Sequence, residues 1–211
     1  MSREARSMTI EVYYGISSPW AYLGMPRLRA IAAEEGVALA LKPIRIIEAN
    51  GGIPLRTRPI ARQAYHVVEL KRWRAYLGMT LNVAPKYYPC RTIEPAARMV
   101  IAAQRAGMDD VALSWAIQRA LWAEERDIAD DETLAALARE ALGATAGDLR
   151  HLADAPECVA AWDANLADAE RMGIFGTPTY VVDGELFWGQ DRLDCVRRRI
   201  RGLRFGEPAA C

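Results

Sequence analysis

The order of apolar and polar residues predicts a strand, a helix and a second strand at the start of the chain. Residues 9–15 alternate in the manner of a half-buried β-strand. A helix is expected from Ser18 to about Gly36, because the Ser18 hydroxyl can cap free N–H groups and Pro19, the first helical residue, has no N–H to leave unpaired. Residues 37–46 form the next strand. A helical crossover between two strands makes them parallel, so we predict a parallel βαβ unit.

Helical periodicity dominates the middle of the chain, from Pro59 to Gly173. Ala, Leu, Arg and Glu are frequent there, and glycine or proline marks most of the predicted helix ends. The predicted helices run from Tyr65 to Gly78, from Pro95 to Gly107, from Asp109 or Asp110 to Trp122, from Asp131 to Gly143 and from Pro156 to Gly173, with a short helical turn at 148–152. We therefore expect an all-helical segment inserted between two parts that contain strands.

Strand patterns return near the end of the chain. Residues 178–182 and 185–188 flank Asp183-Gly184, which is a strong hairpin signal, and a last helix is predicted after Gln190-Asp191. The order βαβ…ββα is that of the thioredoxin fold, with the helical insertion where DsbA-like proteins carry theirs. We predict an α/β thioredoxin-like domain made of residues 9–47 and 174–203, interrupted by a large all-helical insertion domain at 48–173.

Composition and charge narrow the functional classes. The chain has 211 residues, 52% of them apolar, which is enough for a substantial core. It balances 27 basic against 27 acidic side chains, whereas a nucleic-acid-binding domain is usually strongly basic. No apolar run approaches the roughly 18 residues of a membrane span, and residues 1–15 contain no hydrophobic export segment. We expect a cytoplasmic protein with neither a membrane nor a nucleic-acid partner.

Cysteine and histidine offer little chemistry of their own. The four cysteines form no C-x-x-C pair, and the two histidines, His66 and His151, have no metal-ligand spacing. Both histidines fall in helical patterns, where a packing or surface role is expected. No metal site is predicted.

Ser18 occupies the position where a thioredoxin-like fold carries its reactive group, at the start of the first helix. The free N–H groups and the helix dipole stabilise an anion there, usually a thiolate. Serine cannot exchange disulfides, so a disulfide oxidoreductase is excluded, but its hydroxyl can donate a hydrogen bond to a thiolate of another molecule. The alternative is that Ser18 only caps the helix.

Two further motifs fit a bound peptide. A cis peptide bond at Thr177-Pro178 would face the helix start, and Thr177 would offer its backbone N–H and C=O to an extended ligand. At the start of the last helix, Gln190 and Asp191 could hold a group that carries an ammonium and a carboxylate. The alternative for Asp191 is an ordinary N-cap.

Residues 16–24, 175–179 and 189–193 together resemble the 2-hydroxychromene-2-carboxylate isomerases and their relatives, the kappa-class glutathione transferases. The resemblance extends through nearly the whole chain and implies a glutathione-dependent enzyme that forms homodimers. The implied reaction converts 2-hydroxychromene-2-carboxylate into trans-o-hydroxybenzylidenepyruvate by reversible thiolate addition, as in aromatic-compound catabolism.

The resemblance also implies roles for particular residues. Ser18 corresponds to the catalytic serine that activates the glutathione sulfur. The other residues implied to bind glutathione are Thr177, Pro178, Gln190, Asp191, Arg192 and Leu193. Asn50 and Tyr88 correspond to contacts with the aromatic carboxylate substrate, although a turn asparagine and a packing aromatic are the structural alternatives.

Three features keep other interpretations open. Residues 90–92 depart from the family pattern near the substrate, and Trp20 is bulkier than the usual residue. The basic segment 55–62 could bind a substrate carboxylate or form a solvated loop. A kappa-like transferase or peroxidase is the alternative enzyme, and a catalytically silent glutathione- or peptide-binding module is the third interpretation.

Overall fold

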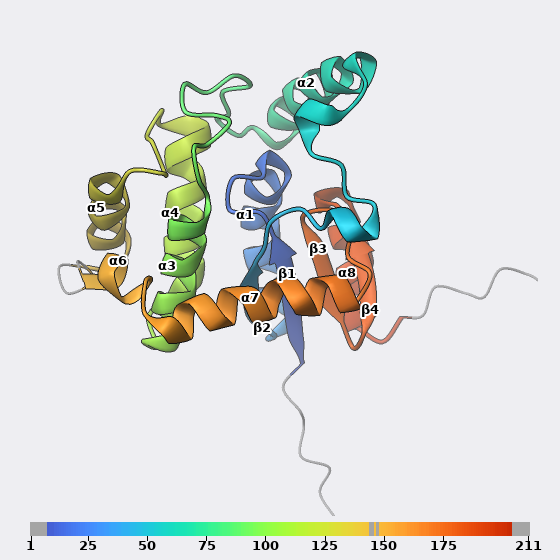
Figure 1. Cartoon of the computed structure of the whole chain (residues 1–211). Coiled ribbons are helices and arrows are strands. Elements are labelled where there is room, and N and C mark those ends of the chain that lie inside the picture. The colour runs from blue at the N-terminus through green and yellow to red at the C-terminus, as the bar shows by residue number, and fades with distance from the viewer. Residues whose placement is uncertain (1–7, 144–145, 147, 204–211) are drawn as a thin grey trace, which may run out of the picture.

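The computed structural model describes residues 8–143, 146 and 148–203, and its centre is a four-stranded sheet (Figure 1). The strands are β1 (Thr9–Tyr14), β2 (Ala38–Pro43), β3 (Thr179–Val182) and β4 (Glu185–Trp188), in the order β2-β1-β3-β4. β1 and β2 are parallel, while β3 is antiparallel to both of its neighbours, β1 and β4. The predicted βαβ unit and the predicted hairpin are both confirmed.

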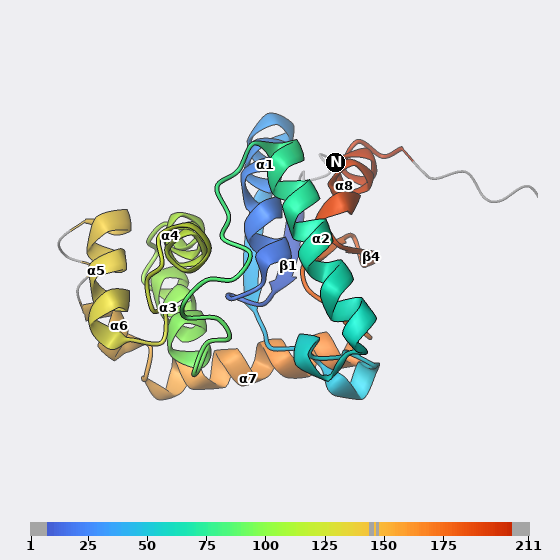
Figure 2. The same cartoon turned by 90° about the horizontal axis from the view of Figure 1, so that it is seen from above.

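Helices cover both faces of the sheet, which explains why the three successive residues at the end of β1, 12–14, are all buried (Figure 2). On one face, Val12 and Tyr14 pack in the main core with α1 (Pro19–Glu35) and α8 (Leu193–Ile200). On the other face, Tyr13 and Val181 belong to a smaller apolar cluster with Ala169 of α7 (Pro156–Arg171). The thioredoxin-like fold is thereby confirmed, with helices above and below a mixed sheet.

The inserted segment is helical, as predicted. It contains α2 (Ile60–Leu77), α3 (Glu94–Arg105), α4 (Asp110–Ala123), α5 (Asp131–Leu142), α6 (Leu149–Leu152) and α7, with 3₁₀ turns η1 (Glu48–Asn50) and η2 (Leu55–Thr57) before α2. One buried cluster joins residues of α3 and α4 to those of α1 and β1. Within it, the buried Tyr14 hydroxyl lies 2.7 Å from Ser114 Oγ of α4, so a hydrogen bond also links the sheet to the insertion.

Helix α2 is the exception to this close packing. It begins at Ile60, five residues before the first residue that its apolar periodicity indicates, and only Leu70 is fully buried. It lies beside α1 at the edge of the sheet domain (Figure 2). Its contacts with α1 are specific: His66 meets Trp20 edge-to-face at 5.3 Å, and Trp73 lies 5.6 Å from the Arg27 guanidinium. Helix α2 therefore forms a wall beside the start of α1.

Candidate active site

Ser18 lies immediately before α1 and caps it, as its sequence predicts. Its backbone is extended, with φ −77° and ψ 121°, and its Oγ accepts a hydrogen bond from the Ala21 amide at 3.4 Å. The Ser18 amide closes a turn with the Gly15 carbonyl at 2.9 Å. This cap uses the oxygen of Ser18 as an acceptor, so the hydroxyl proton stays available for a ligand beside the positive end of the helix.

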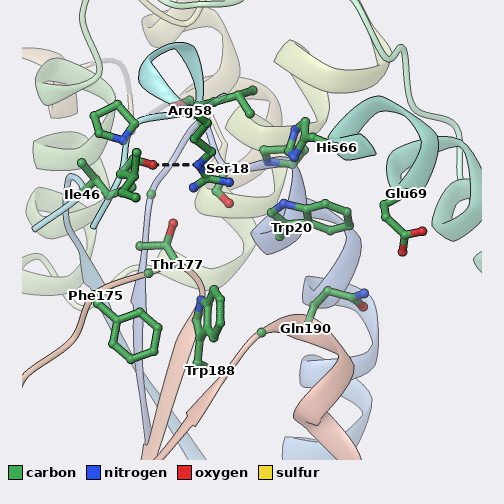
Figure 3. Close-up of a pocket in the computed structure, with 18 of the residues that line it drawn as sticks. Ser18, Trp20, Ile46, Arg58, His66, Glu69, Phe175, Thr177, Trp188 and Gln190 are labelled. Atoms are coloured by element: carbon green, nitrogen blue, oxygen red, sulfur yellow. Dashed lines mark hydrogen bonds between the residues drawn. The ribbon is translucent and has the colours of Figure 1, made fainter. Parts of the chain in front are cut away.

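The peptide bond between Thr177 and Pro178 is cis, which confirms the prediction from the sequence. A Cβ atom placed on Gly15 would lie 3.6 Å from both Ser18 Cβ and Thr177 Oγ1, so these two side chains lie side by side (Figure 3). Within the described part of the chain, the backbone N–H and C=O of Thr177 form no hydrogen bond. Both groups remain available to pair with an extended ligand next to Ser18.

Gln190 begins the short 3₁₀ turn η4 (Gln190–Arg192), which leads into α8. Arg27 of α1 donates to the Gln190 main-chain oxygen at 3.0 Å and also to its side-chain oxygen, which leaves the amide NH2 as the free half of the side chain. Gly24 allows this close approach, because a Cβ at that position would meet Gln190 Cβ at 3.0 Å. Arg27 is thus a positioning residue that the sequence interpretation did not include.

The carboxylate of Asp191 does not cap a helix. Neither η4 nor α8 has a side-chain cap bond, and Asp191 instead pairs with the Arg192 guanidinium at 2.7 Å. The Asp191 side chain is 42% exposed and borders the cavity. The pair therefore offers a carboxylate and a guanidinium side by side, which suits a ligand group with both charges.

A cavity of about 690 Å³ connects these elements. Of the residues predicted to bind glutathione or substrate, those that line it are Ser18, Tyr88, Thr177, Gln190, Asp191 and Arg192. Leu193 and Pro178 do not line the cavity. Leu193 is buried in the core, and the Pro178 carbonyl accepts a hydrogen bond from the Gly189 amide at 2.9 Å. Most of the motifs that are far apart in the sequence do meet at one place.

Asn50 is not among the residues that line the cavity. Its side-chain NH2 points to the end of α7, where it lies 3.3 Å from the Ala169 carbonyl, 2.9 Å from that of Glu170 and 3.1 Å from that of Ile174. The structure thus gives this amide a helix-capping contact, whereas the family resemblance implies a substrate contact.

Tyr88 borders the cavity from the loop between α2 and α3. Its ring lies 4.9 Å from the Trp122 ring, so the packing contact expected as an alternative is present as well. Burial, more than the neighbouring Cys90, raises the pKa of Tyr88, and its phenol is neutral at neutral pH. A second cis bond, Tyr88-Pro89, follows it.

Helix α2 supplies four cavity residues that were not predicted as site residues, namely Tyr65, His66, Glu69 and Trp73. Arg58 and Arg62 line the cavity as well, and they belong to the basic segment 55–62, for which the sequence left open a carboxylate-binding role or a solvated loop. Burial, followed by the charge of Arg58, lowers the pKa of His66, so the imidazole beside Trp20 is neutral at pH 7. No local signal marked His66 as a cavity residue, because its partner lies on another helix.

Across 8–143, 146 and 148–203, no three His, Cys, Asp or Glu side chains gather into a group that could hold a metal ion. None of the described helices combines the length and apolar character of a membrane span.

Comparison with known proteins defines the class. Residues 9–201 match the model of the DSBA-like thioredoxin domain, so the chain is a DSBA-like thioredoxin protein. A 2-hydroxychromene-2-carboxylate isomerase of Pseudomonas putida is 30% identical over 193 residues, which cover 88% of this chain and 91% of the relative. A second isomerase of this name, from Sphingobium xenophagum, is 28% identical over 191 residues, which cover 88% of this chain and 94% of the relative. The chain belongs to the 2-hydroxychromene-2-carboxylate isomerase family.

Solved structures agree with this assignment. A 2-hydroxychromene-2-carboxylate isomerase superposes with a TM-score of 0.76 at 26% identity, covering 93% of this chain and 96% of the other. The cytosolic disulfide reductase DsbM of Pseudomonas aeruginosa, solved with GSH, gives a TM-score of 0.66 at 23% identity, covering 92% and 98%. At that identity the second likeness concerns the fold alone.

Proposed function

We propose that the protein is a glutathione-dependent isomerase that interconverts 2-hydroxychromene-2-carboxylate and trans-o-hydroxybenzylidenepyruvate. One observation carries the proposal: the Ser18 hydroxyl, at the start of α1, lies beside the cis Thr177-Pro178 bond in a cavity wide enough for a peptide and an aromatic acid. The names of the relatives support the same reaction.

The groups around the cavity fit glutathione. Its thiol would lie at Ser18, its cysteinyl N–H and C=O would pair with the free backbone groups of Thr177, and its γ-glutamyl ammonium would face Asp191. Gln190 and Arg192 offer donors for the γ-glutamyl carboxylate. The thiol, the cysteinyl backbone and the γ-glutamyl group of glutathione thus each have a partner of suitable character among the residues that line the cavity.

Glutathione, when bound, supplies a thiolate that adds reversibly to the substrate double bond and so permits rotation about it. The chain has three tasks in this reaction. Ser18 donates a hydrogen bond from its hydroxyl to the sulfur, and the α1 dipole adds to the stabilisation of negative charge. Trp20, His66 and Tyr88 line the same cavity as Ser18 and offer flat side chains against which an aromatic ring can pack.

Ser18→Ala tests this assignment. A hydrogen bond to a charged group is worth about 1.5–3 kcal/mol, which corresponds to a loss of kcat of about 10- to 150-fold. The pKa of the bound glutathione thiol should rise, as followed by thiolate absorbance. Ser18→Thr, which keeps the hydroxyl, should retain most of the activity.

Asp109→Ala is the matched control, because Asp109 caps α4 in the same way, accepting from the Ala112 amide at 2.8 Å far from the cavity. It should lose stability but keep its activity. The assay follows conversion of 2-hydroxychromene-2-carboxylate with substoichiometric glutathione. Isomerisation with full recovery of glutathione supports the proposal. Accumulation of a conjugate indicates a kappa-like transferase. Binding of glutathione without turnover indicates a catalytically silent binding module. An unchanged thiol titration in Ser18→Ala overturns the role of Ser18.

A further inference from the structure

The segment 79–93 between α2 and α3 carries Tyr88 to the border of the cavity. The structure describes all of this segment, which contains neither helix nor strand. It runs between α1 and α4 (Figure 2). Beside Tyr88, its internal backbone bond is the one from the Tyr88 amide to the Pro85 carbonyl, at 3.1 Å. Contacts with other elements therefore decide where the Tyr88 side chain lies.

Glu125, two residues after the end of α4, holds this segment on the N-terminal side of Tyr88. Its carboxylate accepts a hydrogen bond from the Lys86 amide at 2.7 Å and another from the side-chain amide of Asn82. The main-chain amide of Asn82 in turn donates to the Trp122 carbonyl at 2.7 Å. Both oxygens of one carboxylate thus bind one loop and tie residues 82–86 to the end of α4.

Asp127 holds the same segment on the C-terminal side of Tyr88. One of its carboxylate oxygens accepts from the Arg91 guanidinium at 2.9 Å, and the other accepts from the Ala129 amide at 2.9 Å. The Asp127 side chain is only 17% exposed, so this ion pair is better shielded from water than most surface pairs. The loop is therefore fixed two residues before Tyr88 and three residues after it.

Glu125 adopts the left-handed backbone conformation, with φ 55°. Among the described residues, Asp183 is the other non-glycine residue with a positive φ, 49°. Asp183 lies in the Asp-Gly turn of the β3–β4 hairpin, and turns of this kind require positive φ. Glu125 lies between two helices, and a residue with a Cβ atom keeps this conformation only where surrounding contacts compensate for its cost. The bonds from its carboxylate to the loop are such contacts.

We propose that Glu125, assisted by Asp127, is a positioning residue that holds the loop so that Tyr88 meets the aromatic substrate. Neither carboxylate lines the cavity, so both act through the loop. The Tyr88 ring lies 4.9 Å from the Trp122 ring, and one segment, 122–127, thereby supports both the ring and the loop that carries it. The inference rests on the proposed isomerase function, in which Tyr88 borders the space for the aromatic acid.

Glu125→Gly tests the role of the carboxylate, because glycine suits a positive φ and removes only the contacts with the loop. We expect KM for 2-hydroxychromene-2-carboxylate to rise about 2- to 13-fold, the worth of one aromatic contact, with kcat and glutathione affinity little changed. Asp183→Gly is the matched control: it makes the same change at a positive φ, but its carboxylate pairs with Arg199 at 3.5 Å and does not line the cavity. A stabilised Glu125→Gly protein with unchanged KM overturns the proposal.

A double-mutant cycle with Tyr88→Leu distinguishes positioning from a general structural role. Tyr88→Leu should itself raise KM for the aromatic substrate. Glu125→Gly should cause no further rise in that background, because the ring that it positions is gone, although it should still lower the free energy of unfolding in urea. A further rise of KM in the double variant overturns the proposal, since the carboxylate would then act on the cavity by another route.

NMR provides a measurement that does not depend on activity. In the wild type, the Tyr88 and Trp122 rings should show a nuclear Overhauser contact, and the Lys86 amide should be protected from hydrogen exchange. Glu125→Gly should lose both. If the wild type does not isomerise the substrate but these losses occur, the isomerase function fails and the positioning role stands. If isomerisation is intact and Glu125→Gly keeps the ring contact and the protection, the positioning role fails and the isomerase function stands.

Discussion

Asn50→Ala separates a structural role of this residue from a role in substrate binding. The amide nitrogen of Asn50 lies within hydrogen-bond distance of three carbonyls at the end of α7. Two of them, Ala169 and Glu170, also accept from backbone amides at 3.0 Å. Within the described structure, the Ile174 carbonyl has no donor other than Asn50, so the substitution leaves one carbonyl without a protein partner.

The expected loss of stability follows from the number of carbonyls that depend on Asn50 alone. One hydrogen bond contributes about 0.5–1.5 kcal/mol, and weaker stabilisation of the two shared carbonyls adds a fraction of that, so the free energy of unfolding should fall by about 1–2 kcal/mol. In a domain of this size, such a loss lowers Tm by about 2–8 °C. Asn50→Asp should be worse at neutral pH, because it places a negative charge against carbonyls at the negative end of α7.

Urea and thermal denaturation measure the stability, and steady-state kinetics measure KM for the aromatic substrate. Asn165→Ala is a suitable control, because Asn165 makes a single side-chain bond of 3.4 Å, to the Pro43 carbonyl, and should cost much less. A stable Asn50→Ala protein with a strongly raised KM would refute the capping role and support the substrate contact that the family resemblance implies. Loss of stability with unchanged KM is the expected result.

Two other substitutions test the packing and charge around the cavity. Gly24→Ala should gain about 0.5–1 kcal/mol of helix propensity, but its Cβ would lie 2.8 Å from the buried Tyr180 hydroxyl, and overpacking of this kind costs about 1–3 kcal/mol. We expect net destabilisation by urea denaturation and weaker glutathione binding, because Gln190 must move; a stabilised variant would contradict this. For His66, burial lowers the pKa, so the folded protein holds the proton less tightly than the unfolded chain, and stability falls as the pH drops below about 6.5. His66→Gln should weaken that dependence, and an NMR titration midpoint for His66 at or above 6.5 would disprove the assignment.

Local signals in the sequence were sufficient to predict the strands of the sheet and most of the helices. Alternation identifies β1, the Asp-Gly turn identifies the β3–β4 hairpin, and the Ser18-Pro19 pair identifies the start of α1, because each signal depends on neighbours within a few residues. Ser18 and Thr177 were recognisable as site residues for a related reason: the fold fixes where a helix start and a cis-proline loop come together.

Long-range contacts account for what was missed. The three carbonyl partners of Asn50 lie 119, 120 and 124 positions further along the chain, so no local pattern could assign its amide to α7. The start of α2 at Ile60 was also missed, because the first turn of this helix is exposed and lacks the apolar period on which the prediction depends. The same lack of burial hid the cavity-facing side chains of α2.

The two halves of the cavity therefore have different physical origins. The half around Ser18, Thr177 and Gln190 is built from the sheet, α1 and η4, which pack on the buried core of the thioredoxin-like fold. The half around Arg58 and His66 belongs to α2 and its approach, where one residue is fully buried and side chains are held by a few cross-helix contacts. Substitutions in α2 cost little core packing. Substrate preference can consequently diverge through this helix while the proposed glutathione half stays unchanged, and variants of α2 should alter the choice of acid more than the affinity for glutathione.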